Sequence, residues 1–136
     1  MVEKVIADLL SQKQYVEFLI GRDGDFDQIV SSTVLRLKRT MRDDNSSLVL
    51  VLPYEKVEFR NNEENFIDYY DEIEICVESS KTHFKGAIQK RNQSMVDRAD
   101  LVVCYIERQE GGAYQTMKYA IKANKTVVNL FDEIEK

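Results

Sequence analysis

The spacing of apolar residues predicts where the chain forms helices. Its first segment carries apolar residues at intervals of three and four, the period of one helical face, so the chain is predicted to open on a helix of about three turns. These residues are Val2, Val5, Ile6, Leu9 and Leu10. A second run keeps this period after Asp27, which is interpreted as its N-cap. Its members are Ile29, Val30, Thr33, Val34, Leu37 and Met41. Further helices are predicted at 85–98 and 113–124, and a short one near 63–70.

Short apolar runs between these helices predict strands. They are YVEFLI (15–20), LVLVL (48–52), IEICV (73–77), LVVCYI (101–106) and TVVNLF (126–131). The run at 48–52 is apolar throughout and is followed by Pro53, which is typical of a strand covered on both faces. We therefore expect this run in the interior of a sheet.

Strands that alternate with helices predict an α/β fold. The expected architecture is a doubly wound, mainly parallel sheet of about five strands, with helices on both faces. The chain contains no internal repeat, low-complexity tract or linker, so residues 1–136 are expected to form a single domain. The polar stretch at 54–72 is the segment expected to be flexible.

Composition narrows the class of protein. Both cysteines, Cys76 and Cys104, lie within apolar runs and lack the spacing of a metal site, which predicts reduced thiols and a cytoplasmic protein. No stretch approaches the ~20 apolar residues that span a bilayer, which argues against a membrane protein. The net charge of −5 argues against binding to a nucleic acid. The acidic excess at 55–78 is interpreted as a solvated face, with a docking surface for a basic partner as the alternative.

The loop GRDGDFD at 21–27 carries the first candidate site. Gly21 and Gly24 lie between a predicted strand and a predicted helix, where backbone N–H groups and a helix N-terminus can bind an anion. Arg22 supplies a guanidinium group suited to phosphate or carboxylate. Asp27 is interpreted first as a helix cap, with contact to a ribose hydroxyl as the alternative. The GxxG spacing matches no established phosphate-binding fingerprint, so a simple turn accounts for the two glycines equally well.

The helix at 85–98 carries the second candidate. Its predicted inward face consists of Ile88, Met95 and Ala99. The helical period then places Arg91 and Asn92 on either side of the midline of that face. A guanidinium beside an apolar face needs a partner or a ligand for its charge, so Arg91 is the strongest single candidate. The alternative is an arginine whose stem packs while its head reaches water. His83, before this helix, is interpreted as an incidental loop residue rather than a catalytic base.

A second pair of glycines carries the third candidate. Gly111 and Gly112 follow the predicted strand at 101–106, and Thr116 lies in the first turn of the next predicted helix. This arrangement repeats the anion-binding geometry at a second strand end. Because an open α/β sheet builds its ligand crevice at the carboxyl ends of its strands, the three candidate segments are expected to converge there. The alternative is a tight turn that lets the helix pack closely.

Four blocks of this chain, in this order, resemble the SLOG superfamily, specifically its YpsA-like proteins of unknown function. The blocks are GRDGDFD with the apolar helix after it, RNQSMVDRADLVVCYI (91–106), EGGAYQTMKYA (110–120) and KTVVNL (125–130). The superfamily has a Rossmann-like fold and includes the DNA-processing protein A family and the LOG phosphoribohydrolases, which release cytokinin bases from nucleotides. The resemblance implies a crevice that binds a nucleotide or a nucleotide-derived molecule. By position, it implies binding residues Gly21, Gly24, Asp27, Arg91, Asn92, Gly111, Gly112 and Thr116.

Two departures from this family affect the expected function. The LOG enzymes carry a catalytic glutamate in a PGGxGTxxE motif, where this chain continues as MKYA (117–120). The YpsA-like proteins usually begin with a strand and a Gly-His-Arg type motif, and this chain starts after it. It is therefore either an N-terminally shortened form or one whose sheet lacks its usual central strand. A missing interior strand leaves two edges unpaired, so we expect the sheet to close up or to be completed in a homo-oligomer.

These observations lead to one principal functional hypothesis and two alternatives. The principal one is a sensory or regulatory module that binds a nucleotide-like small molecule, with little or no catalysis and with no metal or other cofactor. The first alternative is an N-glycoside hydrolase acting on a nucleoside monophosphate, in which Asp27 or Glu110 helps the base to depart or activates water. The second is a protein-interaction domain with a vestigial crevice, whose acidic surface at 55–78 binds a protein.

Overall fold

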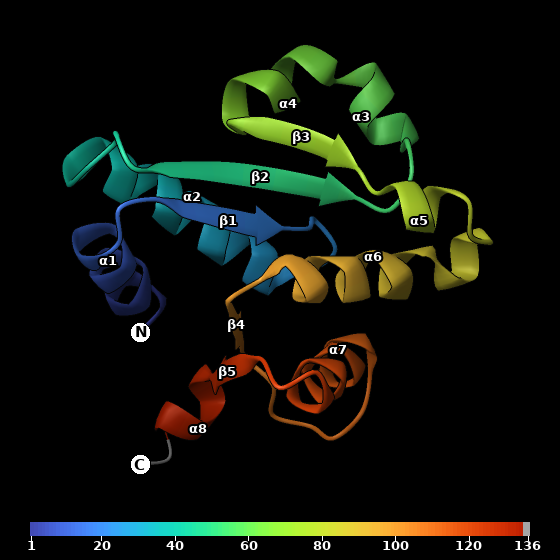
Figure 1. The fold of residues 1–136 in the computed structure, drawn as a ribbon. Helices are drawn as coiled ribbons and strands as arrows, with labels where there is room; N and C mark the ends of the chain where they lie inside the picture. Colours follow the sequence, from blue (N-terminus) through green and yellow to red (C-terminus); the bar gives the residue numbers. More distant parts are fainter. Residues whose placement is uncertain (135–136) are drawn as a thin grey trace.

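The computed structural model describes residues 1–134, in which helices and strands alternate (Figure 1). The elements are α1 (Val2–Gln12), β1 (Val16–Ile20), α2 (Asp25–Thr40), β2 (Ser46–Leu52), α3 (Val57–Asn61), α4 (Glu63–Tyr69), β3 (Glu72–Ile75), α5 (Val77–Ser80), α6 (Phe84–Arg98), β4 (Leu101–Cys104), α7 (Gly112–Lys122), β5 (Thr126–Asn129) and α8 (Leu130–Ile134). The α/β alternation predicted from the apolar spacing is thus confirmed. The short helices α3, α5 and α8 are additions to the predicted elements.

The strands form two separate parallel sheets within residues 1–134. One sheet has three strands in the order β1-β2-β3, and the other pairs β4 with β5. Figure 1 shows the β4 and β5 pair apart from the three-stranded sheet. The prediction of one continuous five-stranded sheet is therefore wrong, because no hydrogen-bonded pairing joins β1 to β4. The expectation that the sheet closes up within the chain is wrong for the same reason.

Strand β2 is the centre of the three-stranded sheet. It pairs with β1 on one edge, where Phe18 lies opposite Leu48, and with β3 on the other, where Leu50 lies opposite Ile73. All five residues of 48–52 are buried, which confirms that this apolar run lies in the sheet interior. Because both edges of β2 are paired, its backbone groups are satisfied without water.

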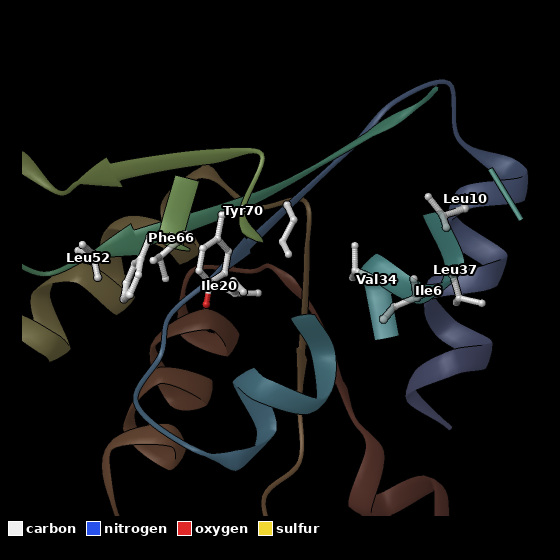
Figure 2. Close-up of a cluster of buried hydrophobic side chains, with 10 residues drawn as sticks. Ile6, Leu10, Ile20, Val34, Leu37, Leu52, Phe66 and Tyr70 are labelled. Carbon is white, nitrogen blue, oxygen red and sulfur yellow. The ribbon is translucent and has the colours of Figure 1, made fainter. Parts of the chain in front are cut away.

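Two groups of apolar side chains cover the two faces of this sheet. Alternate residues of a strand point to opposite faces. Leu48, Leu50 and Leu52 therefore join a core with α1, α2 and α4. This core also contains Ile6, Leu10, Ile20, Val34, Leu37, Phe66 and Tyr70 (Figure 2). Val49 and Val51 face the other way, where Met95 from α6 packs against them. Helices on both faces, as predicted, are thus present around the three-stranded sheet.

Two predicted strands end earlier than expected because a helix follows directly. The run at 73–77 divides into β3 and α5, and the run at 126–131 divides into β5 and α8. Asn129 accounts for the second boundary. Its Oδ1 accepts hydrogen bonds from the backbone N–H groups of Ile106 at 2.9 Å and Phe131 at 3.2 Å, and its Nδ2 donates to the Ile106 carbonyl at 3.0 Å. The side chain therefore replaces strand pairing at this end of the sheet.

No helix within residues 1–134 is long and apolar enough to cross a membrane. In the same part of the chain both Cys76 and Cys104 are free thiols. Burial raises the pKa of Cys104 to about 11, so this thiol stays protonated at neutral pH. Cys104 accordingly behaves as a packed side chain rather than as a nucleophile.

Candidate functional site

The loop that follows β1 is built around a buried glycine. Gly21 comes directly after β1, and a Cβ atom at this position would lie 2.9 Å from Nη1 of Arg91. Such a contact is too close for any side chain, so only glycine lets the guanidinium reach this depth. The loop and α6 are thereby brought together at the carboxyl ends of β1 and β2.

Arg91 is the most buried charged group of the site. Its side chain is 3% exposed, and each of its three guanidinium nitrogens has a protein partner. Nη1 donates to the Val51 carbonyl at 2.9 Å, Nε donates to Oδ1 of Asn92 at 3.0 Å, and Nη2 pairs with Asp23. The prediction that this charge needs a partner is confirmed, and the partners come from three different segments of the chain.

The inward face of α6 differs from the prediction. Its buried residues are Ala87, Arg91 and Val96, whereas Ile88 is 38% exposed. Met95 packs against the sheet as expected, and Ala99 is the C-cap residue. The buried face of α6 is therefore rotated relative to the predicted one. Arg91, whose charge is neutralised by its partner, lies at the centre of this face, where apolar spacing alone had placed Ile88.

Asp23 is a site residue that the sequence analysis missed. Its carboxylate bridges Arg91 and Lys56, with 3.1 Å between Oδ1 and the Lys56 Nζ. Burial alone would raise its pKa, but the hydrogen bonds and positive charges of Arg91 and Lys56 outweigh burial and leave the pKa below its ordinary value. Asp23 therefore stays ionised. The one sequence feature that could have identified Asp23 as a site residue was its position between the two loop glycines. No feature of the sequence indicated Lys56.

Asp27 lies inside the first turn of α2 instead of capping it. The N-cap is Gly24, which supplies no side-chain hydrogen bond, and Oδ2 of Asp27 accepts one from the backbone N–H of Asp23 at 3.1 Å. The N-cap prediction is thus wrong by three positions, because Asp27 turns back to hold the loop. Burial raises the pKa of Asp27 above its ordinary value, and the negative charge of Asp23 adds to the rise.

Arg22 points toward α3 and α4. Its Nη2 pairs with Oε1 of Glu58 at 2.8 Å, and its Nη1 donates to the Tyr70 hydroxyl at 3.1 Å. The guanidinium also lies over the ring of Phe66, 4.6 Å from the ring centroid. With 27% of its side chain exposed, Arg22 remains accessible to a ligand.

A chain of hydrogen bonds extends from this loop toward the second one. Asn92, which accepts from Arg91, donates through Nδ2 to Oγ1 of Thr116 at 3.2 Å, and Gln89 donates to the same oxygen at 3.2 Å. The Thr116 hydroxyl in turn donates to the Gly112 carbonyl at 3.0 Å. The predicted residues Arg91, Asn92, Thr116 and Gly112 are therefore connected through α6 and α7.

The glycines of the site have different structural roles. Gly111 has a φ of +95°, a conformation that favours glycine, and it caps α7. Gly24 has an extended φ of −164°, and a Cβ there would meet no atom within 4 Å. A Cβ at Gly112 would make an ordinary contact with Gln89 at 3.7 Å. Only Gly21 and Gly111 are thus required to be glycine by the structure.

An open groove of about 570 Å³ lies between α6 and α7. It is lined by Gln89, Gln93, Gln115, Lys118, Tyr119, Ile121 and Lys122. It shares Gln89 with the hydrogen-bond chain, but neither glycine loop nor Arg91 lines it. The contacts of the charged groups, rather than this groove, therefore define the candidate site.

His83 has a structural role. Its Nδ1 accepts a hydrogen bond from the backbone N–H of Lys85 at 3.3 Å, so it caps α6, and its ring stacks on Phe84 with 5.0 Å between centroids. The sequence analysis had interpreted His83 as an incidental loop residue rather than a catalytic base. Its cap position explains why it directly precedes the helix.

The fold and the site together define this chain as a mixed α/β protein with two small parallel sheets and a cluster of paired charges beyond the ends of β1 and β2. Comparison with protein-family models, with curated proteins and with solved structures finds no match for the chain. The resemblance to the SLOG superfamily therefore stays a prediction.

Proposed function

We propose that this chain binds a nucleotide or a nucleotide-derived small molecule through its phosphate, beyond the carboxyl ends of β1 and β2. One observation carries the proposal: three cations gather at one strand-to-helix loop, Arg22 within the loop, Lys56 just before α3 and Arg91 in α6. Each is paired with a carboxylate of the chain, and Arg22 and Lys56, which stay partly exposed, can exchange those partners for the phosphate of a ligand.

The start of α2 adds to the attraction for an anion. This helix has 16 residues, and its N-cap residue Gly24 leaves the first backbone N–H groups without a side-chain partner. Those groups and the helix dipole favour a negative group at this end. The space beside Gly24 is open, so an anion could approach these N–H groups closely.

The cations divide into two roles. Arg91 is almost fully buried and each of its guanidinium nitrogens has a partner within the protein, so it positions the loop rather than contacting the ligand. Arg22 and Lys56 keep 27% and 23% of their side chains exposed and are the groups able to contact phosphate. The neutral side chains of Asn92, Gln89 and Thr116 lie on the α6 and α7 side, where their amides and hydroxyl suit a sugar or a base.

A second candidate function is favoured by Asp27. Burial and the negative charge of Asp23 raise its pKa despite the nearby Arg91, and a carboxyl of raised pKa is suited to donate a proton to a departing base. This observation supports the N-glycoside hydrolase alternative, with Asp27 as the acid. Glu110, the other carboxylate considered for that reaction, is exposed.

The experiment that tests binding is thermal unfolding with a panel of nucleoside monophosphates, using the free nucleosides as uncharged controls. A ligand at 100 times its dissociation constant should add about 2.7 kcal/mol to the free energy of unfolding. Lys56→Met should remove most of this gain. The same change at the exposed Lys85 should leave it intact. Equal stabilisation of both variants would remove the charge cluster from the site.

Release of free base, measured by chromatography, separates the two functions. A binding module stabilises without release. A hydrolase releases base, and Asp27→Asn should abolish that release while leaving ligand-dependent stabilisation in place. Neither stabilisation nor release by any nucleotide would leave the interaction-domain hypothesis as the remaining one.

A further inference from the structure

The connection between β2 and β3 folds onto the first glycine loop. It contains α3 and α4, and its aromatic residues Phe66 and Tyr70 lie beside Ile20 at the end of β1 (Figure 2). Phe59 and Phe66 pack edge to face, 5.4 Å between ring centroids, and Phe66 belongs to the main core. The far end of this connection is therefore anchored, although its composition predicts a flexible segment.

The near end of the connection contacts the glycine loop through two ion pairs, while Phe59 of α3 packs against the core. Glu58 in the first turn of α3 pairs with Arg22, and Lys56 just before α3 pairs with Asp23. The Glu58 side chain is 54% exposed, so water competes for its ion pair. Lys56 and Asp23 are more enclosed, at 23% and 24%. Of the two attachments, the pair made by Glu58 is the easier to exchange.

Carboxylates pair with the cations of the cluster when the connection is attached. The cations are Arg22, Lys56 and Arg91, their ion-pair partners are Asp23 and Glu58, and Asp25 and Asp27 lie nearby in the first turn of α2. The Asp27 carboxylate accepts from the backbone N–H of Asp23, and the Asp23 carboxylate is held by Arg91 of α6. Glu58 is the one carboxylate brought from another element. Its departure leaves Arg22 without an anionic partner while the rest of the loop stays intact.

We propose that Glu58 is an internal competitor for the ligand's phosphate. The incoming phosphate replaces Glu58 on Arg22, contacts Lys56 as well, and releases α3 from the loop. This inference rests on the proposed function and adds a regulated element to it, because occupation of the site then changes the position of α3. The aromatic anchor at Phe66 and Tyr70 keeps α4 in place, so the movement is confined to the near end.

The competition selects the class of ligand. A carboxylate ligand offers Arg22 the same group as Glu58 does, so its interaction with Arg22 would be no stronger than the one it replaces. A phosphate monoester carries more negative charge and three acceptor oxygens, so it can satisfy the Arg22 fork and the Lys56 ammonium together. An uncharged nucleoside cannot displace Glu58 at all. The site should therefore require a terminal phosphate, with the base contributing less.

The test compares Glu58→Gln with Glu63→Gln. Both variants remove one negative charge from the same connection, but Glu63 makes no ion pair within residues 1–134. Inorganic phosphate is the probe, titrated at constant ionic strength against chloride, with the amide NMR signals of residues 21–27 as the readout. Removing an exposed ion pair of this kind should tighten phosphate binding about twofold to fivefold. Glu63→Gln should bind as the wild type does.

A second readout follows α3 directly. Phosphate should shift the amide signals of residues 55–61 in the wild-type protein, and these residues should already be shifted in Glu58→Gln without phosphate. If phosphate and nucleoside monophosphates bind the wild type but the two variants do not differ, the competition is overturned and the proposed function stands. If neither probe binds any of the three proteins, the proposed function fails and the inference fails with it.

Discussion

The two sheets of this protein differ in how completely their strands are covered. Leu48, Val49 and Leu50 of β2 are fully buried, whereas every residue of β4 keeps part of its surface exposed. β2 has a partner strand on each edge and helices on each face. Within residues 1–134, β4 is paired on the β5 edge alone (Figure 1). The difference teaches that an apolar strand is fully buried only when other strands pair with both of its edges and helices cover both of its faces. Burial comes from contacts between segments that are distant in the sequence.

The charge cluster belongs to the better covered region. Its loop follows β1, and its buried arginine comes from α6, which packs on β2 through Met95. The hydrogen bonds from Asn92 to Thr116 then connect the cluster to α7 and the less covered sheet. The better covered region thus holds the charges, and the less covered region contributes to the neutral polar groups.

The largest contrast is expected in the cores of the two sheets. Leu50→Ala should lower the free energy of unfolding by about 2–5 kcal/mol, because it leaves a cavity among fully buried neighbours. Val103→Ala in β4 should cost less than half as much, since its side chain already meets solvent. Denaturant unfolding of both variants measures the difference, and equal losses would show that the two sheets share one core.

The two glycine loops provide the next contrast. Gly21→Ala should cost about 1–3 kcal/mol, because its Cβ would meet Nη1 of Arg91 at 2.9 Å. Gly112→Ala should change stability by no more than about 0.5 kcal/mol, because its Cβ would make only an ordinary contact. The same unfolding measurement checks both. A neutral Gly21→Ala would mean that Arg91 moves easily, which would contradict its buried position.

A smaller effect is expected from the titration of Asp27. Its pKa is raised above the ordinary value of 3.8, so the folded state binds the proton more tightly than the unfolded chain. The stability that this proton contributes is complete below about pH 3.8 and is lost as the pH rises through the raised pKa. Asp27→Asn should therefore be the more stable protein at pH 7, by about 0.5 kcal/mol. That advantage should shrink as the pH falls toward 4, because the wild-type side chain is then neutral too.

Unfolding curves of the two proteins between pH 4 and pH 7 measure this difference. Asp23 titrates in both proteins, so its contribution to the pH dependence largely cancels in the comparison. Because its pKa is lowered in the folded state, that contribution has the opposite sign to the one made by Asp27. A constant difference across this range would show that Asp27 has the same pKa in the folded and unfolded states.

The last comparison is between two neighbouring positions of β1, at its open edge. The Val16 N–H donates toward β2, so by strand alternation Glu17 directs its N–H away from β2. Glu17→Pro should change stability by less than about 1 kcal/mol, whereas Phe18→Pro should disrupt the pairing with β2. If a second copy completes this edge, sedimentation should show concentration-dependent association that Glu17→Pro removes. A wild-type protein that stays monomeric would make the homo-oligomer prediction wrong.

Local patterns predicted most of the elements but not how the strands pair. The period of α2 and the apolar run of β2 depend on neighbouring residues, so each can be recognised in the sequence. The separation of β4 from β1 depends on hydrogen bonds between segments about 80 residues apart, for which no local pattern exists. The early end of β5 likewise depends on the hydrogen bonds of the Asn129 side chain, which apolar spacing does not contain.

The sequence by itself determined that Arg91 lies near an apolar helix face and therefore needs a partner, because an unpaired buried charge is too costly to keep. Only the tertiary structure decided that the partner is Asp23, 68 residues away in the sequence, and that Lys56 and Glu58 join the same cluster. A residue's polarity is a local property that can be read from its side chain. Many carboxylates of the chain could neutralise Arg91 equally well. The packing of β1, β2 and α6 decides which of them lies close enough to pair with it.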